Sequence, residues 1–380
     1  MGTNKLKIIA DENIPGLEPM FGAGVDLVKV SGRTLSAEYL KGADVLLVRS
    51  VTQVNDALLA QANQLKMVGT ATIGTDHIDQ ASLVKRGIPF FSAPGCNANA
   101  VAEYVLSVVF NLREEEALYN HLTVGIVGVG NVGGRLQQRL TALGIKVLLN
   151  DPPRQAKGEQ GFVSLQELLS RADIICCHTP LIMDSDFPTY HLIAHEQLAA
   201  CKADALIINA GRGSVIDNQA LLIALDERPD LQVVLDVWEH EPRLDESLVN
   251  RVSIATPHIA GYSLEGKLRG THMLRSRFAE IFGEEPPAAF PSYLPKAAIH
   301  HVHVSDEVTA KALIRLVYDP YCDDRALRAS IGYQDQATRF DRLRKHYPVR
   351  REFESLVIKG LAESQLSNTL KNLGFTLELA

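Results

Sequence analysis

The feature that most constrains the fold is a glycine-rich turn directly after a short apolar strand. Residues 122–133 read LTVGIVGVGNVG, in which residues 124–127 suit a buried parallel strand and G-x-G-x-x-G follows. The apolar residues that recur at helical spacing after the first glycine are Val132, Leu136, Leu140 and Leu143. Because glycine is common, the bare motif is weak, but the order strand, turn, helix predicts a dinucleotide-binding turn.

Each glycine of this turn has a physical task. Gly128 makes the tight turn, Gly130 lets the backbone approach a pyrophosphate, and Gly133 allows the helix to pack closely on the strand. The first residues of the helix, Asn131 and Val132, offer free backbone N–H groups to the phosphates.

An acidic residue stands where such a turn requires one. Asp151 follows a second predicted strand, residues 145–150, and lies eighteen residues beyond Gly133. A carboxylate there accepts hydrogen bonds from ribose hydroxyls and repels a 2′-phosphate, so NAD is favoured. Arg154 keeps NADP open as an alternative. Thr179 is a weaker cofactor candidate, because a Thr-Pro pair also fits a plain turn.

Composition favours a cytoplasmic enzyme of several domains. A chain of 380 residues, 46% hydrophobic, exceeds one usual core, and two or three domains are expected. A net charge of −7 argues against nucleic-acid partners, and the basic cluster of residues 339–351 is interpreted as a solvated helical face. No run is long enough to span a bilayer, no signal-peptide stretch is seen, and five scattered cysteines suit a reducing compartment.

Three histidine and cysteine groups are weighed as metal sites, and no metal is predicted. Cys176, Cys177 and His178 follow one another on a predicted strand, where neighbouring side chains point to opposite faces, so these cysteines are interpreted as core thiols. The pairs His191 with His195 and His301 with His303 lack a third ligand at a recognisable spacing.

The order of strands and helices predicts an α/β protein. The strands expected in the first part are 6–10, 26–30, 45–48, 66–69 and 89–92, with helices near 37–41, 55–61 and 79–86. A long amphipathic helix, 97–112, leads to a second unit with strands at 124–127, 145–150, 173–178, 205–209, 231–237 and 252–255, and a capping box at 164–167. Glycine and prolines crowd residues 282–295, beyond which helices are expected at 306–317, 323–329, 335–346 and 365–373.

Polar residues collect where the strands of the second unit end, which is where open parallel sheets bind ligands. Arg212 can hold a carboxylate bidentately, His258 can act as acid and base, and Glu241 can fix the tautomer of His258. Asp236 is a candidate for the nicotinamide carboxamide. Taken singly, each also fits a plain structural role: a helix-capping arginine, a solvated loop acid or a core histidine.

Three segments resemble the D-isomer-specific 2-hydroxyacid dehydrogenase family. They are NAGRG at 209–213, DVWEHEP at 236–242 and TPHIAG at 256–261, and the resemblance covers about residues 6–282. It implies a flavodoxin-like substrate domain (1–94 and 262–285) and a Rossmann NAD domain (95–261), both doubly wound, around a cleft. It also implies Arg212 as the carboxylate-binding residue, His258 as acid/base and Glu241 as its partner, with cofactor contacts extending to Gly261.

Further segments point to a phosphorylated substrate. VRSVT at 48–52, GTATIGTDHID at 69–79 and Tyr262 resemble family members that oxidise 4-phosphoerythronate on the route to pyridoxal 5′-phosphate. Ser50, Thr72, Arg49 and Tyr262 are therefore the candidate substrate contacts, although a turn after a strand explains the first two equally well. The last residues, 286–380, match in size and position an α+β dimerisation domain, which predicts a homodimer.

Two alternatives stay open. A 3-phosphoglycerate dehydrogenase would keep every catalytic residue, but its regulatory tail should show a βαββαβ pattern, whereas this tail is mainly helical at first. An NAD-sensing corepressor-like module would keep the fold and bind a partner instead of turning over a substrate.

Overall fold

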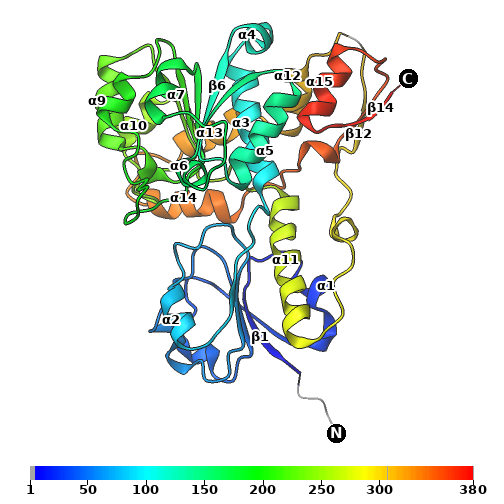
Figure 1. The fold of residues 1–380 in the computed structure, drawn as a ribbon. Coiled ribbons are helices and arrows are strands. Elements are labelled where there is room, and N and C mark those ends of the chain that lie inside the picture. Colours follow the sequence, from blue (N-terminus) through cyan, green and yellow to red (C-terminus); the bar gives the residue numbers. More distant parts are fainter. Residues whose placement is uncertain (1–4, 306, 380) are drawn as a thin grey trace. The chain divides into compact units, whose positions relative to one another are not determined.

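The computed structural model describes residues 5–305 and 307–379, which divide into two compact units (Figure 1). The first comprises Met1–Asn97 and Ser263–Lys296, and the second comprises Ala98–Tyr262 and Ala297–Ala380. The chain therefore leaves the first unit, builds most of the second, and returns for one helix. The C-terminal segment from residue 297 onward belongs to the second unit.

The first unit is built on a five-stranded parallel sheet. Its strands, in spatial order, are β2 (Asp26–Val30), β1 (Lys7–Asp11), β3 (Val45–Val48), β4 (Met67–Thr70) and β5 (Phe90–Phe91). This is the flavodoxin-like order that was predicted. β3 is fully buried, as its unbroken VLLV sequence requires of a central parallel strand.

The helices of the first unit are shorter than the sequence predicts. Two of the three expected helices, near 37–41 and 55–61, are the 3₁₀ turns η2 (Ala37–Leu40) and η3 (Leu58–Gln61). The third, expected at 79–86, is the α-helix α2 (Gln80–Lys85), with Asp79 as its N-cap. The remaining elements are α1 (Leu17–Phe21), η1 (Gly22–Gly24), η5 (Phe290–Tyr293) and α11 (Leu264–Phe282). The helix α11 ends at Gly283, whose left-handed φ of 66° favours glycine.

The second unit contains a six-stranded parallel sheet. In spatial order its strands are β11 (Ile254–Ala255), β10 (Gln232–Leu235), β9 (Leu206–Asn209), β8 (Ile174–Cys177), β6 (Thr123–Val127) and β7 (Lys146–Asn150). The chain runs outward in one direction from β6 to β7 and in the other from β8 onward. The switch point therefore lies between β6 and β8, and dinucleotides bind at such points.

Helices cover this sheet. They are α3 (Ala98–Leu112), α4 (Glu115–Asn120), α5 (Asn131–Ala142), α6 (Pro152–Ala156), α7 (Leu165–Arg171), α8 (His195–Ala199), η4 (Gly213–Val215), α9 (Asn218–Glu227) and α10 (Glu246–Arg251). Ser164 caps α7 by accepting a hydrogen bond from the Glu167 amide at 3.1 Å. The helix α3 differs from the prediction: it is buried on nearly all sides rather than amphipathic, because helices of the C-terminal segment also pack on it.

The C-terminal segment is α+β. Its elements are β12 (His301–His303), α12 (Ala310–Val317), α13 (Pro320–Arg328), α14 (Gln336–Lys345), η6 (Phe353–Ser355), β13 (Val357–Lys359), α15 (Gln365–Leu373) and β14 (Thr376–Glu378). The strands form a small parallel sheet in the order β12-β13-β14. This arrangement is not the βαββαβ pattern of the alternative with a regulatory tail.

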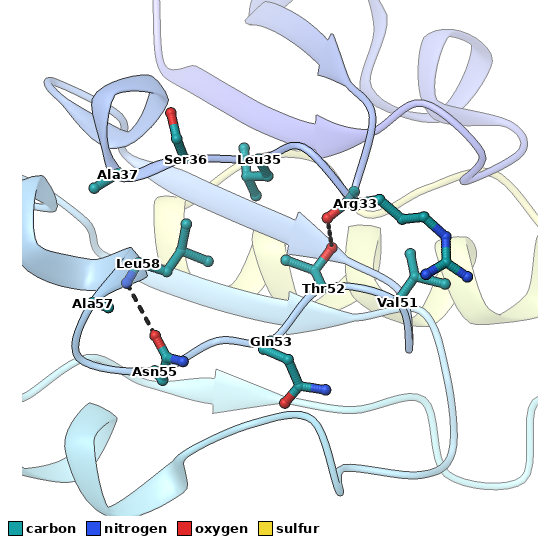
Figure 2. Close-up of a pocket in the computed structure, with 11 residues that line it drawn as sticks. Arg33, Leu35, Ser36, Ala37, Val51, Thr52, Gln53, Asn55, Ala57 and Leu58 are labelled. Carbon is teal, nitrogen blue, oxygen red and sulfur yellow. Dashed lines mark hydrogen bonds between the residues drawn. The ribbon is translucent and has the colours of Figure 1, made fainter. Parts of the chain in front are cut away.

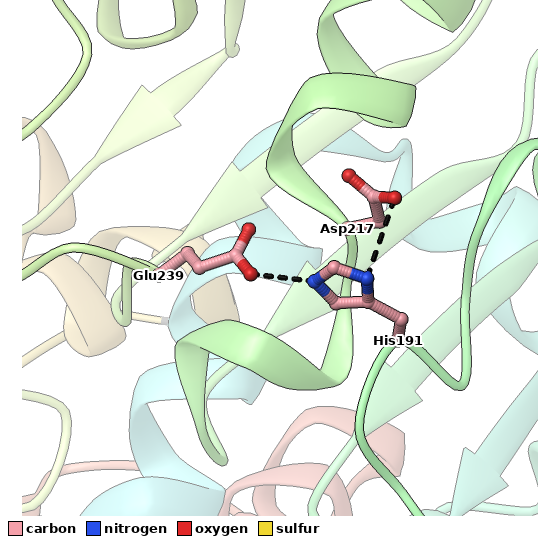
Figure 3. Close-up of side chains that lie close together, drawn as sticks. All are labelled: His191, Asp217 and Glu239. Carbon is pink, nitrogen blue, oxygen red and sulfur yellow. Dashed lines mark hydrogen bonds and ion pairs between the residues drawn. The ribbon is translucent and has the colours of Figure 1, made fainter.

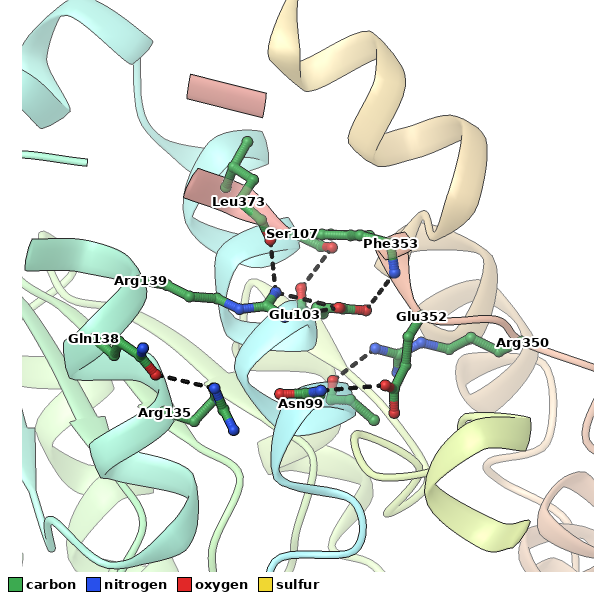
Figure 4. Close-up of polar contacts among 11 residues, drawn as sticks. Asn99, Glu103, Ser107, Arg135, Gln138, Arg139, Arg350, Glu352, Phe353 and Leu373 are labelled. Carbon is green, nitrogen blue, oxygen red and sulfur yellow. Dashed lines mark hydrogen bonds and ion pairs between the residues drawn. The ribbon is translucent and has the colours of Figure 1, made fainter. Parts of the chain in front are cut away.

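Buried charges join the C-terminal segment to α3 (Figure 4). Arg139 donates to Glu103 and to the Leu373 carbonyl, and the Phe353 amide donates to Glu103 at 3.0 Å. Burial raises the pKa of Glu103 to about 8, and Arg139 opposes that rise. Arg350 is only 4% exposed, so the interpretation of residues 339–351 as one solvated face was wrong.

The prediction that the two adjacent cysteines are core thiols is settled. Cys176 and Cys177 are both buried, and they belong to the two separate cores on opposite faces of the sheet, which confirms that they are core thiols. Burial raises the pKa of Cys177 to about 12. Among the residues described, no helix is both long enough and apolar enough to cross a membrane.

Candidate functional site

The glycine-rich turn lies between β6 and α5 with the geometry that its sequence predicts. Gly128 has a φ of 86°, and a Cβ added to Gly133 would lie 2.1 Å from the Gly128 carbonyl oxygen. At Gly130, by contrast, an added Cβ would meet no atom of the described residues within 4 Å. Close packing therefore fixes the first and last glycines, whereas the middle one borders open space, as approach to a phosphate requires.

Asp151 binds the turn itself. Its carboxylate accepts hydrogen bonds from the Val129 amide at 2.8 Å and the Arg154 amide at 3.1 Å. The Arg154 guanidinium donates to the Val129 carbonyl at 2.7 Å and to Glu159. Arg154 is thus already engaged, which weakens it as a receptor for the 2′-phosphate of NADP.

Thr179 follows β8, on the other side of the switch point. Its Oγ1 is buried and has no hydrogen-bond partner among the described residues. An added Cβ at Gly128 would lie 2.8 Å from the Thr179 methyl group, so the two loops touch. A buried hydroxyl without a partner costs free energy, and a ligand that reaches it would remove that cost. The turn, Asp151 and Thr179 together fit a dinucleotide.

The loops that follow β9 and β10 are packed together. A Cβ on Gly213 would lie 2.0 Å from the Trp238 carbonyl oxygen, so only glycine fits there. The Asn209 amide donates to the Arg212 carbonyl at 3.0 Å, and Arg212 Nη1 donates to the Gly211 carbonyl at 2.9 Å. The backbone that carries Arg212 is therefore fixed from both sides.

Glu241 and His258 form a direct pair. Glu241 Oε2 lies 2.7 Å from His258 Nδ1, and Glu241 Oε1 accepts the Trp238 amide at 2.9 Å. An ionised carboxylate only accepts hydrogen bonds, so Nδ1 carries the proton and Nε2 keeps its lone pair. The His258 side chain is 34% exposed, so part of the imidazole is accessible to a ligand. His258 also has a φ of 56°, a strained conformation of the kind that clusters at functional sites.

Asp236 supports the loop that contains His258. Its carboxylate accepts hydrogen bonds from Thr256 Oγ1 at 2.6 Å, the Ile259 amide at 2.8 Å and the Ala260 amide at 2.9 Å. It is 1% exposed. A carboxylate offers about four acceptor positions, and these bonds fill roughly three of them. Positioning the loop up to Gly261 is a role that the sequence did not reveal.

The candidate substrate residues Arg49, Ser50 and Thr72 all lie in the first unit, after β3 and β4. Thr72 Oγ1 lies 2.7 Å from Thr70 Oγ1 and donates to the Gly74 carbonyl at 3.0 Å. Arg49 makes a long contact of 3.5 Å with the Asn13 carbonyl, and Ser50 is exposed. Adjacent strand ends therefore present two hydroxyls and a cation within one unit.

A cavity of about 380 Å³ opens beside this region of the first unit (Figure 2). Its polar lining includes Arg33, Thr52 and Asn55, but neither Ser50 nor Thr72 belongs to it. Thr52 Oγ1 donates to the Gly32 carbonyl, and Asn55 Oδ1 accepts the Leu58 amide. These bonds brace the cavity wall, and the candidate substrate residues lie outside it.

His191 has neighbours that its spacing to His195 does not predict (Figure 3). Its Nε2 lies 2.5 Å from Glu239 and its Nδ1 lies 3.4 Å from Asp217, so that ligand-type atoms of the three residues lie within 4.8 Å of one another. The two carboxylates also accept backbone amides, including that of Asn218 at 3.1 Å. This set, which we call the His191 clasp, joins three loops and holds His191 at a left-handed φ of 50°.

Replacing His191 with alanine is expected to lower the free energy of unfolding by about 1–2 kcal/mol, because two partly buried carboxylates lose their shared partner. Thermal unfolding of His191→Ala and of the control His195→Ala, an exposed histidine, measures this. A chelator that lowered the melting temperature of the parent protein but not of His191→Ala would instead identify the clasp as a metal site.

Comparison with known proteins gives matches over the whole chain. Residues 110–260 match the model of the D-isomer specific 2-hydroxyacid dehydrogenase NAD-binding domain, and residues 293–374 match a domain of unknown function. The chain is similar to erythronate-4-phosphate dehydrogenase of Edwardsiella ictaluri (49% identity; 99% of this chain and 100% of that protein). The protein of the same name from Marinobacter nauticus is 47% identical, over 98% of this chain and 100% of its own length.

Among solved structures, NAD⁺-bound 3-phosphoglycerate dehydrogenase of Entamoeba histolytica matches with a TM-score of 0.63. The match covers 75% of this chain and 99% of that one at 23% identity, and it speaks for the fold alone. The full-length relatives, in contrast, extend through the C-terminal segment.

Proposed function

Because this chain belongs to the D-isomer-specific 2-hydroxyacid dehydrogenase family and is of the erythronate-4-phosphate type, we propose that it oxidises 4-phosphoerythronate. The product would be 2-oxo-3-hydroxy-4-phosphobutanoate, an intermediate on the route to pyridoxal 5′-phosphate. The observation that carries the proposal is the Glu241–His258 pair, 2.7 Å apart, in an NAD-binding unit with full-length relatives of that name.

Proton removal falls to His258. Its Nδ1–H donates to Glu241, and its Nε2 takes the proton of the substrate C2 hydroxyl. Glu241 fixes the tautomer and stabilises the imidazolium that forms. Arg212 binds the substrate carboxylate through its planar guanidinium and thereby fixes C2 in front of the base. All three side chains belong to the second unit.

The cofactor is NAD, which accepts the hydride from C2 when bound. We assign its pyrophosphate to Gly128, Gly130, Asn131, Val132 and Gly133, its adenosine ribose to Asp151, and further contacts to Thr179, Asp236 and Gly261. The supporting observations are the open space at Gly130 and the unpartnered hydroxyl of Thr179. Asp151 lies against the turn through the Val129 amide.

The substrate's phosphate needs hydrogen-bond donors and positive charge. We assign it and the sugar hydroxyls to Arg49, Ser50, Thr72 and Tyr262, because hydroxyl and guanidinium groups bind phosphate well. Residues 286–380 are proposed to be the dimerisation domain of a homodimer, and the protein is proposed to act in the cytoplasm.

The test is the initial rate of NADH formation with 4-phosphoerythronate and with 3-phosphoglycerate. A clear preference for 4-phosphoerythronate is expected. A parallel assay supplies a 2-oxo acid as electron acceptor, so that retained cofactor does not hide turnover. Faster turnover of 3-phosphoglycerate would overturn the substrate assignment, and turnover of neither would favour an NAD-sensing role.

A further inference from the structure

A cation of the C-terminal segment lies against Tyr262, four residues beyond His258. Arg344 is in the last turn of α14, and its guanidinium carbon lies 5.6 Å from the centre of the Tyr262 ring and 5.8 Å from that of Phe340. Its Nε is buried and has no hydrogen-bond partner among the described residues. Arg344 therefore packs on two aromatic rings, and it also interacts with the Tyr262 hydroxyl.

The ring that holds Arg344 belongs to the loop that carries the base. Tyr262 lies four residues beyond His258, and its amide donates to the Ile259 carbonyl at 2.8 Å, which closes that loop into a turn. On its other side the Tyr262 ring meets the edge of Tyr347, with ring centres 5.7 Å apart. Two residues of the C-terminal segment, Arg344 and Tyr347, thus both contact Tyr262, at the end of the loop that carries His258.

Arg344 also acts on Glu241 through its charge. Burial would raise the pKa of Glu241, but His258, Arg344 and the Trp238 amide reverse this effect, so that the pKa is lowered. The charged or titratable groups that act on Arg344 in turn are Tyr262, Glu241 and Asp341. The charges of His258, when protonated, and of Arg344 both favour the ionised form of the Glu241 carboxylate.

We propose that Arg344 is a positioning residue for the Glu241–His258 pair, a fixed cation that complements the Glu241 carboxylate and orients the loop ending at Tyr262. This inference rests on the proposed function, in which His258 is the base. It assigns to the C-terminal segment a part in catalysis in addition to any part in assembly.

The experiment compares the pH dependence of kcat/KM in the full-length protein and three variants. Arg344→Gln removes the charge, Arg344→Lys keeps it, and Arg342→Gln is the control, an exposed arginine on the same helix. Without Arg344 the pair is protonated more readily, so the acidic limb of the Arg344→Gln profile is expected to shift to higher pH by about half a unit or more. In Arg344→Lys the acidic limb should lie at the same pH as in the parent protein, and Arg342→Gln should not shift it.

A readout without turnover separates this inference from the proposed function. The His258 imidazole is titrated by NMR in ¹⁵N-histidine-labelled protein, with its signal assigned by its loss in His258→Gln. If the parent protein turns over neither phosphorylated acid, the proposed function fails. A His258 titration that is shifted in Arg344→Gln but not in Arg342→Gln would still support the inference. An unmoved titration in Arg344→Gln would overturn it, as would a rise in KM alone with an unchanged pH profile. If Arg344→Gln does not fold, Arg344→Lys decides the question. A His258 titration like that of the parent protein would support the role of the charge, and a shifted titration would overturn the inference.

Discussion

His258→Gln is expected to lower kcat/KM for substrate oxidation by about 10²- to 10⁴-fold, the usual contribution of a general base. The reason is that glutamine has no lone pair of comparable basicity where Nε2 now stands. NAD affinity should stay near that of the parent protein, because the phosphate-binding turn is built by Gly128–Gly133 and not by His258. Steady-state rates and NAD titration by fluorescence measure the two quantities.

The controls for this prediction come from the same chain. His195→Gln changes an exposed histidine and should leave kcat/KM unaltered. Glu241→Gln should lower kcat/KM as well, because an amide Oε1 can still accept the Trp238 amide whereas an amide nitrogen cannot accept from His258 Nδ1–H. Near-normal turnover by His258→Gln would remove this residue from the mechanism.

The elements that the sequence predicts well are those specified by neighbouring residues. The strand 124–127, the glycine-rich turn and the helix that begins within it follow one another without interruption, so local pattern alone locates them. Cys176 and Cys177 are buried on opposite faces of the sheet, as the two-residue period of a strand predicts. Prediction was weaker for the segments at 37–41 and 55–61, because apolar spacing does not separate a single 3₁₀ turn from a helix.

What the sequence does not reveal depends on contacts between distant residues. His191 meets Glu239 across forty-eight positions, and no local spacing predicts that pair. Arg344 and Arg350 fall in a run that contains many basic residues, which suggests a solvated face. Arg350 is buried where the C-terminal segment covers α3, which is itself buried on nearly every side, whereas Arg344 packs on the rings of Tyr262 and Phe340.

Arg350 is the residue whose loss should destabilise the second unit most. It donates to the Ala100 carbonyl at 2.7 Å and to the Ala260 carbonyl at 3.0 Å, and its guanidinium carbon lies 3.9 Å from the centre of the Tyr318 ring. It therefore ties the C-terminal segment both to the first turn of α3 and to the catalytic loop.

Arg350→Met is expected to lower the free energy of unfolding by about 3–5 kcal/mol, because two buried carbonyls lose their donor and buried acids nearby lose their cation. Those acids include Glu103 and Asp323, and burial raises the pKa of both. Chemical denaturation followed by circular dichroism measures the change, with the exposed Arg342→Met as the control. Because Ala260 lies two residues beyond His258, kcat should fall in the folded variant too. An Arg350→Met protein as stable as Arg342→Met would show that Arg350 adds nothing measurable to the other contacts that hold the C-terminal segment.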